Sequence, residues 1–151
     1  MENMANFTLS NLKTVQPIQG WQDFFEEGSG FLKTAVAAYQ KSKRAYTAPI
    51  LYNLAAMAIE KFSMAALMMH GAMPYNHTMA DLVDGLEGTF PGEFSAMRDG
   101  LLQLDTYQEI CDLEGFSINP PGMEEIPAML DLAGTIQGLV KEKISVQKVQ
   151  L

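Results

Sequence analysis

A run of apolar residues between Pro49 and His70 constrains the fold more than any other feature of the sequence. Its members recur at steps of 3, 1, 3, 4, 3 and 4 residues, so they form one stripe along the face of an α-helix. They are Leu51, Leu54, Ala55, Ala58, Phe62, Ala65 and Met69. Pro49 suits the first turn of this helix, where its missing N–H is not needed, and Gly71 and Pro74 end it.

A second apolar row, rich in methionine, lies on a neighbouring face of the same helix. It contains Ile50, Met57, Met64 and Met68. A helix that is apolar on two faces is central in a bundle, or central and also part of an oligomer interface. Met69, Met73 and Met79 extend the methionine cluster, which we interpret as core filling, with ligand binding as the alternative.

The spacing of apolar residues predicts further helices from Trp21 to Tyr39, from Met79 to Leu86, from Phe94 to Tyr107 and from Met123 to Ile144. The first contains Gly28-Ser29-Gly30, so it is one helix or a helix in two pieces. Asn76 or Thr78 is expected to cap the second. Because no segment alternates like a strand, the sequence predicts an all-α fold, a four- to five-helix antiparallel up-and-down bundle.

The length of 151 residues fits a single compact domain. Residues 1–20 show no sustained period and finish in turn-forming residues, which predicts a flexible N-terminal arm. Residues 21–151 are then expected to form one helical-bundle domain.

The formal charge of −8 argues against non-specific binding to DNA or to an anionic membrane, since both attract basic surfaces. Any contact with a nucleotide or RNA has to be local. The densest basic patch is Lys41, Lys43 and Arg44, and we interpret it first as a solvated helix end.

The cellular compartment is indicated by what the sequence lacks. Cys111 is the sole cysteine, so neither an intramolecular disulfide nor a cysteine-rich zinc site can form. The first 20 residues contain no basic region followed by a continuous apolar run, so we do not expect secretion. No stretch has the roughly 18 uncharged apolar residues expected of a membrane span. A cytoplasmic protein without a membrane segment is the prediction.

Residues 58–67, with the sequence AIEKFSMAAL, are followed by Gly71, Pro74 and His77. This pattern resembles the HEPN family, in which an A-x-E-K-x-x-x-A-x-L helix precedes a Gly, then a Pro and a His that opens the third helix. A tyrosine-bearing segment, a proline-rich loop and a last helix follow in the same order as in that family. The resemblance covers roughly residues 21–146.

The resemblance implies an antiparallel bundle that usually pairs into a homodimer. Many members of the family are RNases, often toxins, whereas others are partners of a minimal nucleotidyltransferase or proposed binders of nucleotides. The RNase members carry an Arg and, a few residues later, a His near the start of the last helix. There the His would transfer protons and the Arg would stabilise charge on the phosphate.

The sequence departs from the RNase pattern at the residues that would cut RNA. No histidine follows Arg44 or Arg98 at the family's spacing. The segment expected to hold the motif, residues 107–114, carries Glu109, Asp112 and Glu114, which would repel a phosphodiester. We therefore predict a non-catalytic HEPN-like interaction module that binds a partner protein, such as a nucleotidyltransferase, or a nucleotide-like ligand.

Glu60, Lys61, His77 and Tyr107 are the candidate contacts for that ligand or partner. Glu60 and Lys61 are adjacent and point to different parts of the helix surface, so they do not form one catalytic pair. Lys61 suits a phosphate, although a lysine that extends along an apolar surface is the commoner arrangement. The structural alternative for His77 is that it fixes the turn after the helix.

Two alternatives remain open. One is an RNase or nucleotide-processing enzyme of a toxin–antitoxin-type system that uses Lys61, His77 and Tyr107, and the other is a purely structural dimer. No metal site or cofactor is predicted, because the Glu-x-x-His spacing of helical-bundle metal sites is absent after Glu60 and Glu109. The acidic neighbours of Cys111 also disfavour a thiolate nucleophile.

Overall fold

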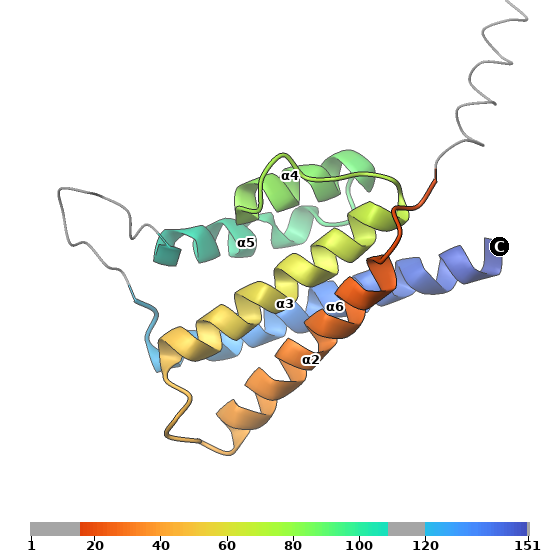
Figure 1. The fold of residues 1–151 in the computed structure, drawn as a ribbon. Coiled ribbons are helices and arrows are strands. Elements are labelled where there is room, and N and C mark those ends of the chain that lie inside the picture. The colour runs from red at the N-terminus through yellow and green to blue at the C-terminus, as the bar shows by residue number, and fades with distance from the viewer. Residues whose placement is uncertain (1–15, 109–119, 151) are drawn as a thin grey trace, which may run out of the picture.

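The computed structural model describes residues 16–108 and 120–150, and within these ranges it contains five α-helices and no strand (Figure 1). The helices are α2 (Trp21–Gln40), α3 (Ala48–Met69), α4 (Met79–Thr89), α5 (Arg98–Asp105) and α6 (Ile126–Gln150). Contacts between antiparallel helices confirm the predicted all-α bundle.

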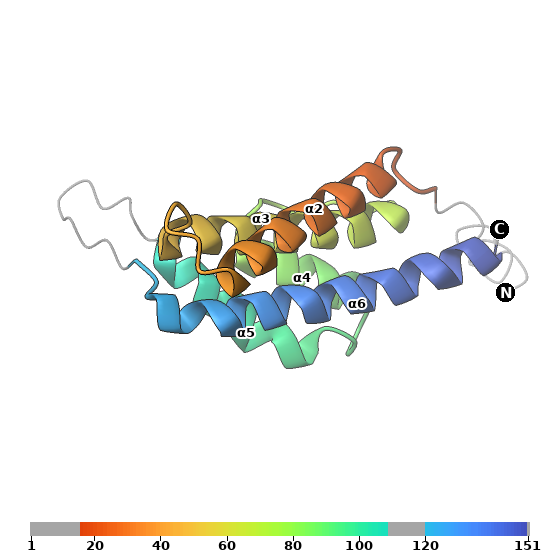
Figure 2. The ribbon, with the colours of Figure 1, turned by 90° about the horizontal axis from the view of Figure 1, so that it is seen from below.

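The apolar helix α3 lies at the centre of the molecule. In Figure 1 it runs between α2 on one side and the α4–α5 pair on the other, and α6 passes behind it, as Figure 2 shows from below. Of its 22 residues, 14 are buried. The predicted stripe is buried except for the half-buried Leu54, whereas the methionine-rich row is divided, because Met64 and Met68 are buried and Ile50 and Met57 are exposed.

Helix α3 is also long and apolar enough to cross a membrane, with a mean hydropathy of 1.3 over its most apolar 18 residues. However, 67% of those residues are buried inside the bundle, and the core helix of a helical bundle can be equally long and apolar. The length and composition of α3 therefore do not distinguish a membrane span from a core helix.

Helix α2 continues through Gly28-Ser29-Gly30 without a break, so the alternative of two separate pieces is wrong. Gly28 is buried where α2 packs against α3, and a Cβ atom there would lie 2.9 Å from two ring carbons of Phe62. No atom lies within 4 Å of a Cβ placed at Gly30. The first glycine is therefore needed for packing, whereas the second faces open space.

The predicted boundaries of the later helices differ from the observed ones. The segment from Phe94 to Tyr107 is a short α5 with one 3₁₀ turn before it, Ser95–Met97, and one after it, Thr106–Gln108. The last helix continues to Gln150, beyond the predicted Ile144. Most of the predicted arm lies outside the described residues, but the Ile18 N–H donates to the Met68 carbonyl oxygen at 2.7 Å.

The two ends of the bundle are held differently. At one end Trp21, the first residue of α2, is buried and borders a shallow hollow together with Ile144 of α6. At the other end, α2 and α3 are joined by a tight turn whose residues 41–47 lie close to Met123, just before α6.

Candidate functional site

Three of the four candidate residues lie together on the face formed by α2 and α3. Glu60 and His77 are in hydrogen-bonding contact, with Nδ1 of His77 lying 2.5 Å from Oε1 of Glu60. Lys61 turns to the other side, where its Nζ lies 2.8 Å from Oε2 of Glu27 and 4.4 Å from the ring centre of Phe24. Glu60 and Lys61 thus contact different partners, as their adjacency predicts.

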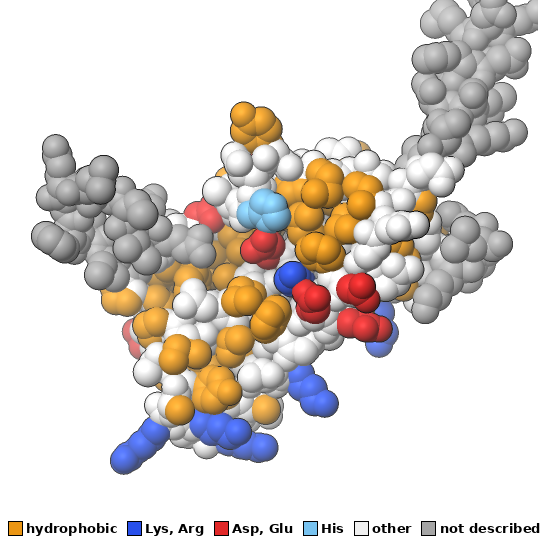
Figure 3. All heavy atoms as spheres, viewed as in Figure 1, with side chains coloured by type: hydrophobic (Ala, Val, Ile, Leu, Met, Phe, Trp, Pro, Cys, Tyr) orange, Lys and Arg blue, Asp and Glu red, His pale blue; other side chains and the backbone are white. Residues whose placement is uncertain are grey.

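These contacts make a row of four side chains in the order His77, Glu60, Lys61 and Glu27, which we name the polar row. Figure 3 shows a histidine and charged side chains crossing this surface, with hydrophobic side chains on both sides. The row is accessible, since the His77 side chain is 60% exposed and that of Glu60 is 35% exposed. Its ion pairs are consequently screened by solvent and contribute little to stability.

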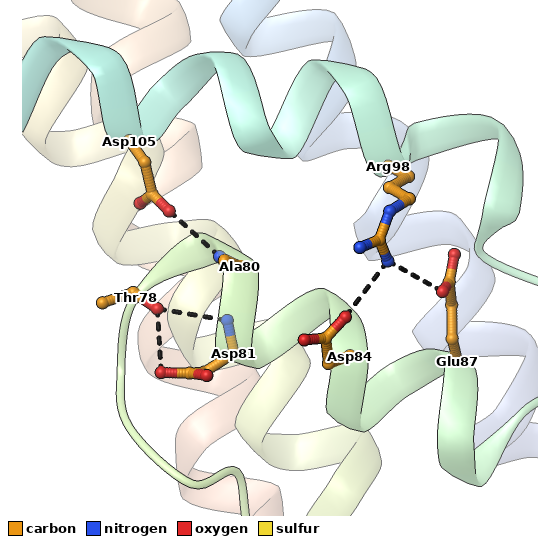
Figure 4. A network of polar contacts seen from close by, with 7 residues as sticks. All are labelled: Thr78, Ala80, Asp81, Asp84, Glu87, Arg98 and Asp105. Atoms are coloured by element: carbon orange, nitrogen blue, oxygen red, sulfur yellow. Dashed lines mark hydrogen bonds and ion pairs between the residues drawn. The ribbon is translucent and has the colours of Figure 1, made fainter.

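The loop that carries His77 is anchored at the start of α4. The Thr78 hydroxyl oxygen accepts a hydrogen bond from the Asp81 N–H at 3.1 Å, which confirms Thr78 as the cap. The Asp105 carboxylate, at the end of α5, accepts from the N–H groups of Met79 and Ala80 at 2.9 and 3.0 Å. Figure 4 shows the contact with Ala80 and the cap. These bonds fix the residue that follows His77.

Tyr107 does not join the polar row. It is 6% exposed, and its hydroxyl donates to Oε2 of Glu125, in the 3₁₀ turn Met123–Glu125 just before α6. Its ring packs edge-on against Tyr52, with ring centres 5.5 Å apart, and the Tyr52 hydroxyl donates to the Leu104 carbonyl oxygen. Tyr107 borders a hollow of about 650 Å³ between α5 and α6. In the described structure it holds these helices together.

Arg98 is bound to acidic residues of its own chain. Its Nη1 lies 3.1 Å from Oδ1 of Asp84 and 2.9 Å from Oε2 of Glu87 (Figure 4). The hydrogen bond to Asp84, with the charge of Glu87, raises the pKa of the guanidinium. Its guanidinium therefore already has two acidic partners. Glu109, Cys111, Asp112 and Glu114 lie outside the described residues.

His70 is the C-cap residue of α3 and stands apart from the polar row. Its ring packs edge-on against Phe90, with ring centres 4.7 Å apart. Partial burial lowers the pKa of the imidazole, and the nearby Lys143 lowers it further, while Glu93 opposes the change. The neutral ring is thus favoured in this position.

Across residues 16–108 and 120–150, no group of three His, Cys, Asp or Glu side chains is placed to hold a metal ion. Comparison of the chain with protein-family models, with curated proteins and with solved structures found no match.

One feature that the sequence interpretation missed is a hollow of about 710 Å³ at the turn between α2 and α3. Lys43 and Arg44 border it, and so do Tyr39 and Tyr46. The signal in the sequence is a basic cluster with a tyrosine at each end, Tyr39 and Tyr46, whereas the basic patch alone indicates only a solvated helix end.

Proposed function

We propose that the protein is a non-catalytic, HEPN-like interaction module that pairs with a second copy of itself through the α2–α3 face. The observation that carries this proposal is the polar row, which lies between groups of hydrophobic side chains on that face (Figure 3).

The apolar part of the proposed interface comes from α3. Ile50 and Met57 are 42% and 41% exposed, although most of this helix is buried. They are seven residues apart, so they lie on one face of the helix, two turns from each other. Large hydrophobic side chains grouped on a surface are typical of a binding site for another protein.

The charge pattern favours a second copy over an unrelated partner. Along the row the charges alternate, with His77 positive when protonated, Glu60 negative, Lys61 positive and Glu27 negative. A homodimer with a two-fold axis brings the same surface of both copies together in opposite directions. Each Glu60 then faces the other copy's Lys61, and each His77 faces the other copy's Glu27. Because the row has four members of alternating charge, it is complementary to the same row of a second copy related by the two-fold axis.

The resemblance of residues 58–77 to the HEPN family agrees with this proposal, because members of that family usually form dimers. By the same resemblance, a nucleotidyltransferase is the expected protein partner of the dimer. A cytoplasmic location is expected because the chain has a single cysteine. These two expectations rest on the resemblance and on the composition of the chain.

The first experiment measures the mass of the full chain in solution by sedimentation over a range of concentrations. We expect a dimer for the natural sequence and a monomer for Met57→Lys, because a lysine would be buried in the contact. Val146→Lys is the matched control, since Val146 of α6 is 54% exposed and outside the face. A monomer for the natural sequence, or equal effects of both variants, would refute the proposal.

A second experiment tests the charge pairing. Glu60→Lys alone places lysines opposite each other, and Lys61→Glu alone places glutamates opposite each other, so each variant should remain monomeric. An equimolar mixture restores both opposite-charge pairs and should contain the mixed dimer. If the mixture behaves like the separate variants, the two-fold arrangement of the row is wrong.

The contact between Glu60 and His77 also favours a second candidate, an RNase or nucleotide-processing enzyme. A carboxylate that orients a histidine is a common arrangement for general base catalysis. None of the four hollows described in the structure is bordered by either residue, which weighs against it. Cleavage of tRNA or mixed RNAs by the natural sequence, lost in His77→Ala, would favour the enzyme.

A further inference from the structure

The basic residues of this acidic protein are unevenly distributed. Lys61, Arg98 and Lys143 each contact a carboxylate. Within residues 16–108 and 120–147, no carboxylate partner is found for the other basic side chains. They are Lys33, Lys41, Lys43, Arg44 and Lys141. Three of these five fall in the turn between α2 and α3, so positive charge without a partner is concentrated at one end of the bundle.

The backbone of this turn is fixed by hydrogen bonds. The Lys43 N–H donates to the Ala38 carbonyl oxygen and the Ser42 N–H to that of Tyr39, both at 3.1 Å. Ser42 has a φ of 49°, and together these features form the Schellman motif that ends many helices. The Tyr46 N–H then donates to the Lys43 carbonyl oxygen at 3.0 Å. The basic residues therefore project from a defined loop.

The hollow beside this turn combines two kinds of lining. Six of its side chains are cationic or carry a hydroxyl group, and none of them has a hydrogen-bond partner among the described residues. They are Lys43, Arg44, Ser42, Thr47, Tyr39 and Tyr46. The rest of the lining includes the apolar Ala38, Ala48 and Met123. Its volume of about 710 Å³ is in the range of small-molecule sites.

We infer that this hollow binds a nucleoside monophosphate. The phosphate would lie between Lys43 and Arg44, which can neutralise a dianion and donate several hydrogen bonds to it. The tyrosine rings and the apolar wall would contact the base, since aromatic side chains stack on any base. The first turn of α3, at Ala48, borders the hollow and adds a partial positive charge. This site shares no residue with the polar row and does not depend on pairing.

The experiment titrates the full chain with adenosine 5′-monophosphate, ribose 5-phosphate and adenosine, and measures the dissociation constants by calorimetry. We expect the monophosphate to bind best, ribose 5-phosphate at least tenfold more weakly, and adenosine more weakly still. Lys43→Gln with Arg44→Gln should weaken monophosphate binding at least tenfold. Tyr46→Leu should raise the dissociation constant of the monophosphate until it is close to that of ribose 5-phosphate.

The matched control is Lys33→Gln with Lys141→Gln, which removes the same amount of charge from outside the hollow. It should change the dissociation constant of the monophosphate less than twofold. Helix content measured by circular dichroism verifies that each variant is folded. Equal losses in the two double variants would show general charge attraction and would overturn the inference. So would an absence of monophosphate binding, or equally tight binding of a phosphoserine peptide. None of these outcomes depends on whether the chain is a dimer.

Discussion

Gly28 of α2 lies directly against the ring of Phe62 in α3. A Cβ atom on Gly28 would be 2.9 Å from both Cδ1 and Cε1 of that ring and 3.0 Å from Cβ of Lys61. The ring is completely buried and has little room to move away. The distance between α2 and α3 is therefore set by a residue without a side chain, and this approach also brings Lys61 next to Glu27.

The close approach predicts opposite effects for two glycines of the same helix. Gly28→Ala should lower the free energy of unfolding by about 1–3 kcal/mol, because the added methyl group overpacks the contact. Gly30→Ala should raise it by about 0.5–1 kcal/mol, because alanine is the better helix former and the site is open. Urea denaturation measures both, and a destabilised Gly30→Ala variant would contradict this account.

Ser63 should be replaceable with a gain in stability. Its Oγ is buried inside the bundle and has no hydrogen-bond partner among the described residues. Removal of an unpaired buried hydroxyl removes a desolvation penalty, so Ser63→Ala should raise the free energy of unfolding by about 1 kcal/mol. Thermal unfolding is a suitable measurement, and a clear loss of stability would show that the hydroxyl has a partner.

The carboxylate of Asp105 is expected to be the main support of α4. It accepts two backbone N–H groups at the start of that helix, where the helix dipole also favours a negative charge. Asp105→Ala should cost about 1–2 kcal/mol of unfolding free energy, as the loss of a helix cap does. Asp131→Ala, at an exposed position inside α6, should have little effect in the same denaturation experiment.

His70 predicts a pH dependence of stability. Burial lowers its pKa below 6.5 in the folded protein, so the unfolded chain takes up the proton first as the pH falls. The stabilising contribution is complete above pH 6.5 and is lost as the pH falls through the lower, folded-state pKa. His70→Gln should be less sensitive than the natural sequence across this window, and identical pH profiles would exclude the effect.

The sequence predicted the helices because each has an apolar face with helical spacing. The stripe from Leu51 to Met69 located the central helix to within a few residues, and Thr78, one of the two expected caps, begins α4. Gly28 left open whether α2 is one helix or two, because a glycine that permits close packing cannot be distinguished from a helix break without the neighbouring ring of Phe62. Tertiary contacts of this kind leave no periodic signal.

The candidate site was predictable in part. Glu60, Lys61 and His77 were singled out, but their partners come from other elements, so the polar row could not be foreseen. Tyr107 was placed beside them only by resemblance, and its contact with Glu125 lies elsewhere. The hollow at the α2–α3 turn depends on Met123, which is distant in the sequence from Tyr39 and Tyr46.

The position of Trp21 gives the chain a built-in optical reporter. It is the only tryptophan in the 151 residues, and it is buried at the start of α2 near Ile144 of α6. Its fluorescence emission therefore follows the docking of those two helix ends, whereas circular dichroism averages over all helices. A red shift in emission without a loss of helical signal would mean that the end of α6 had separated from α2 while the other helices remained intact.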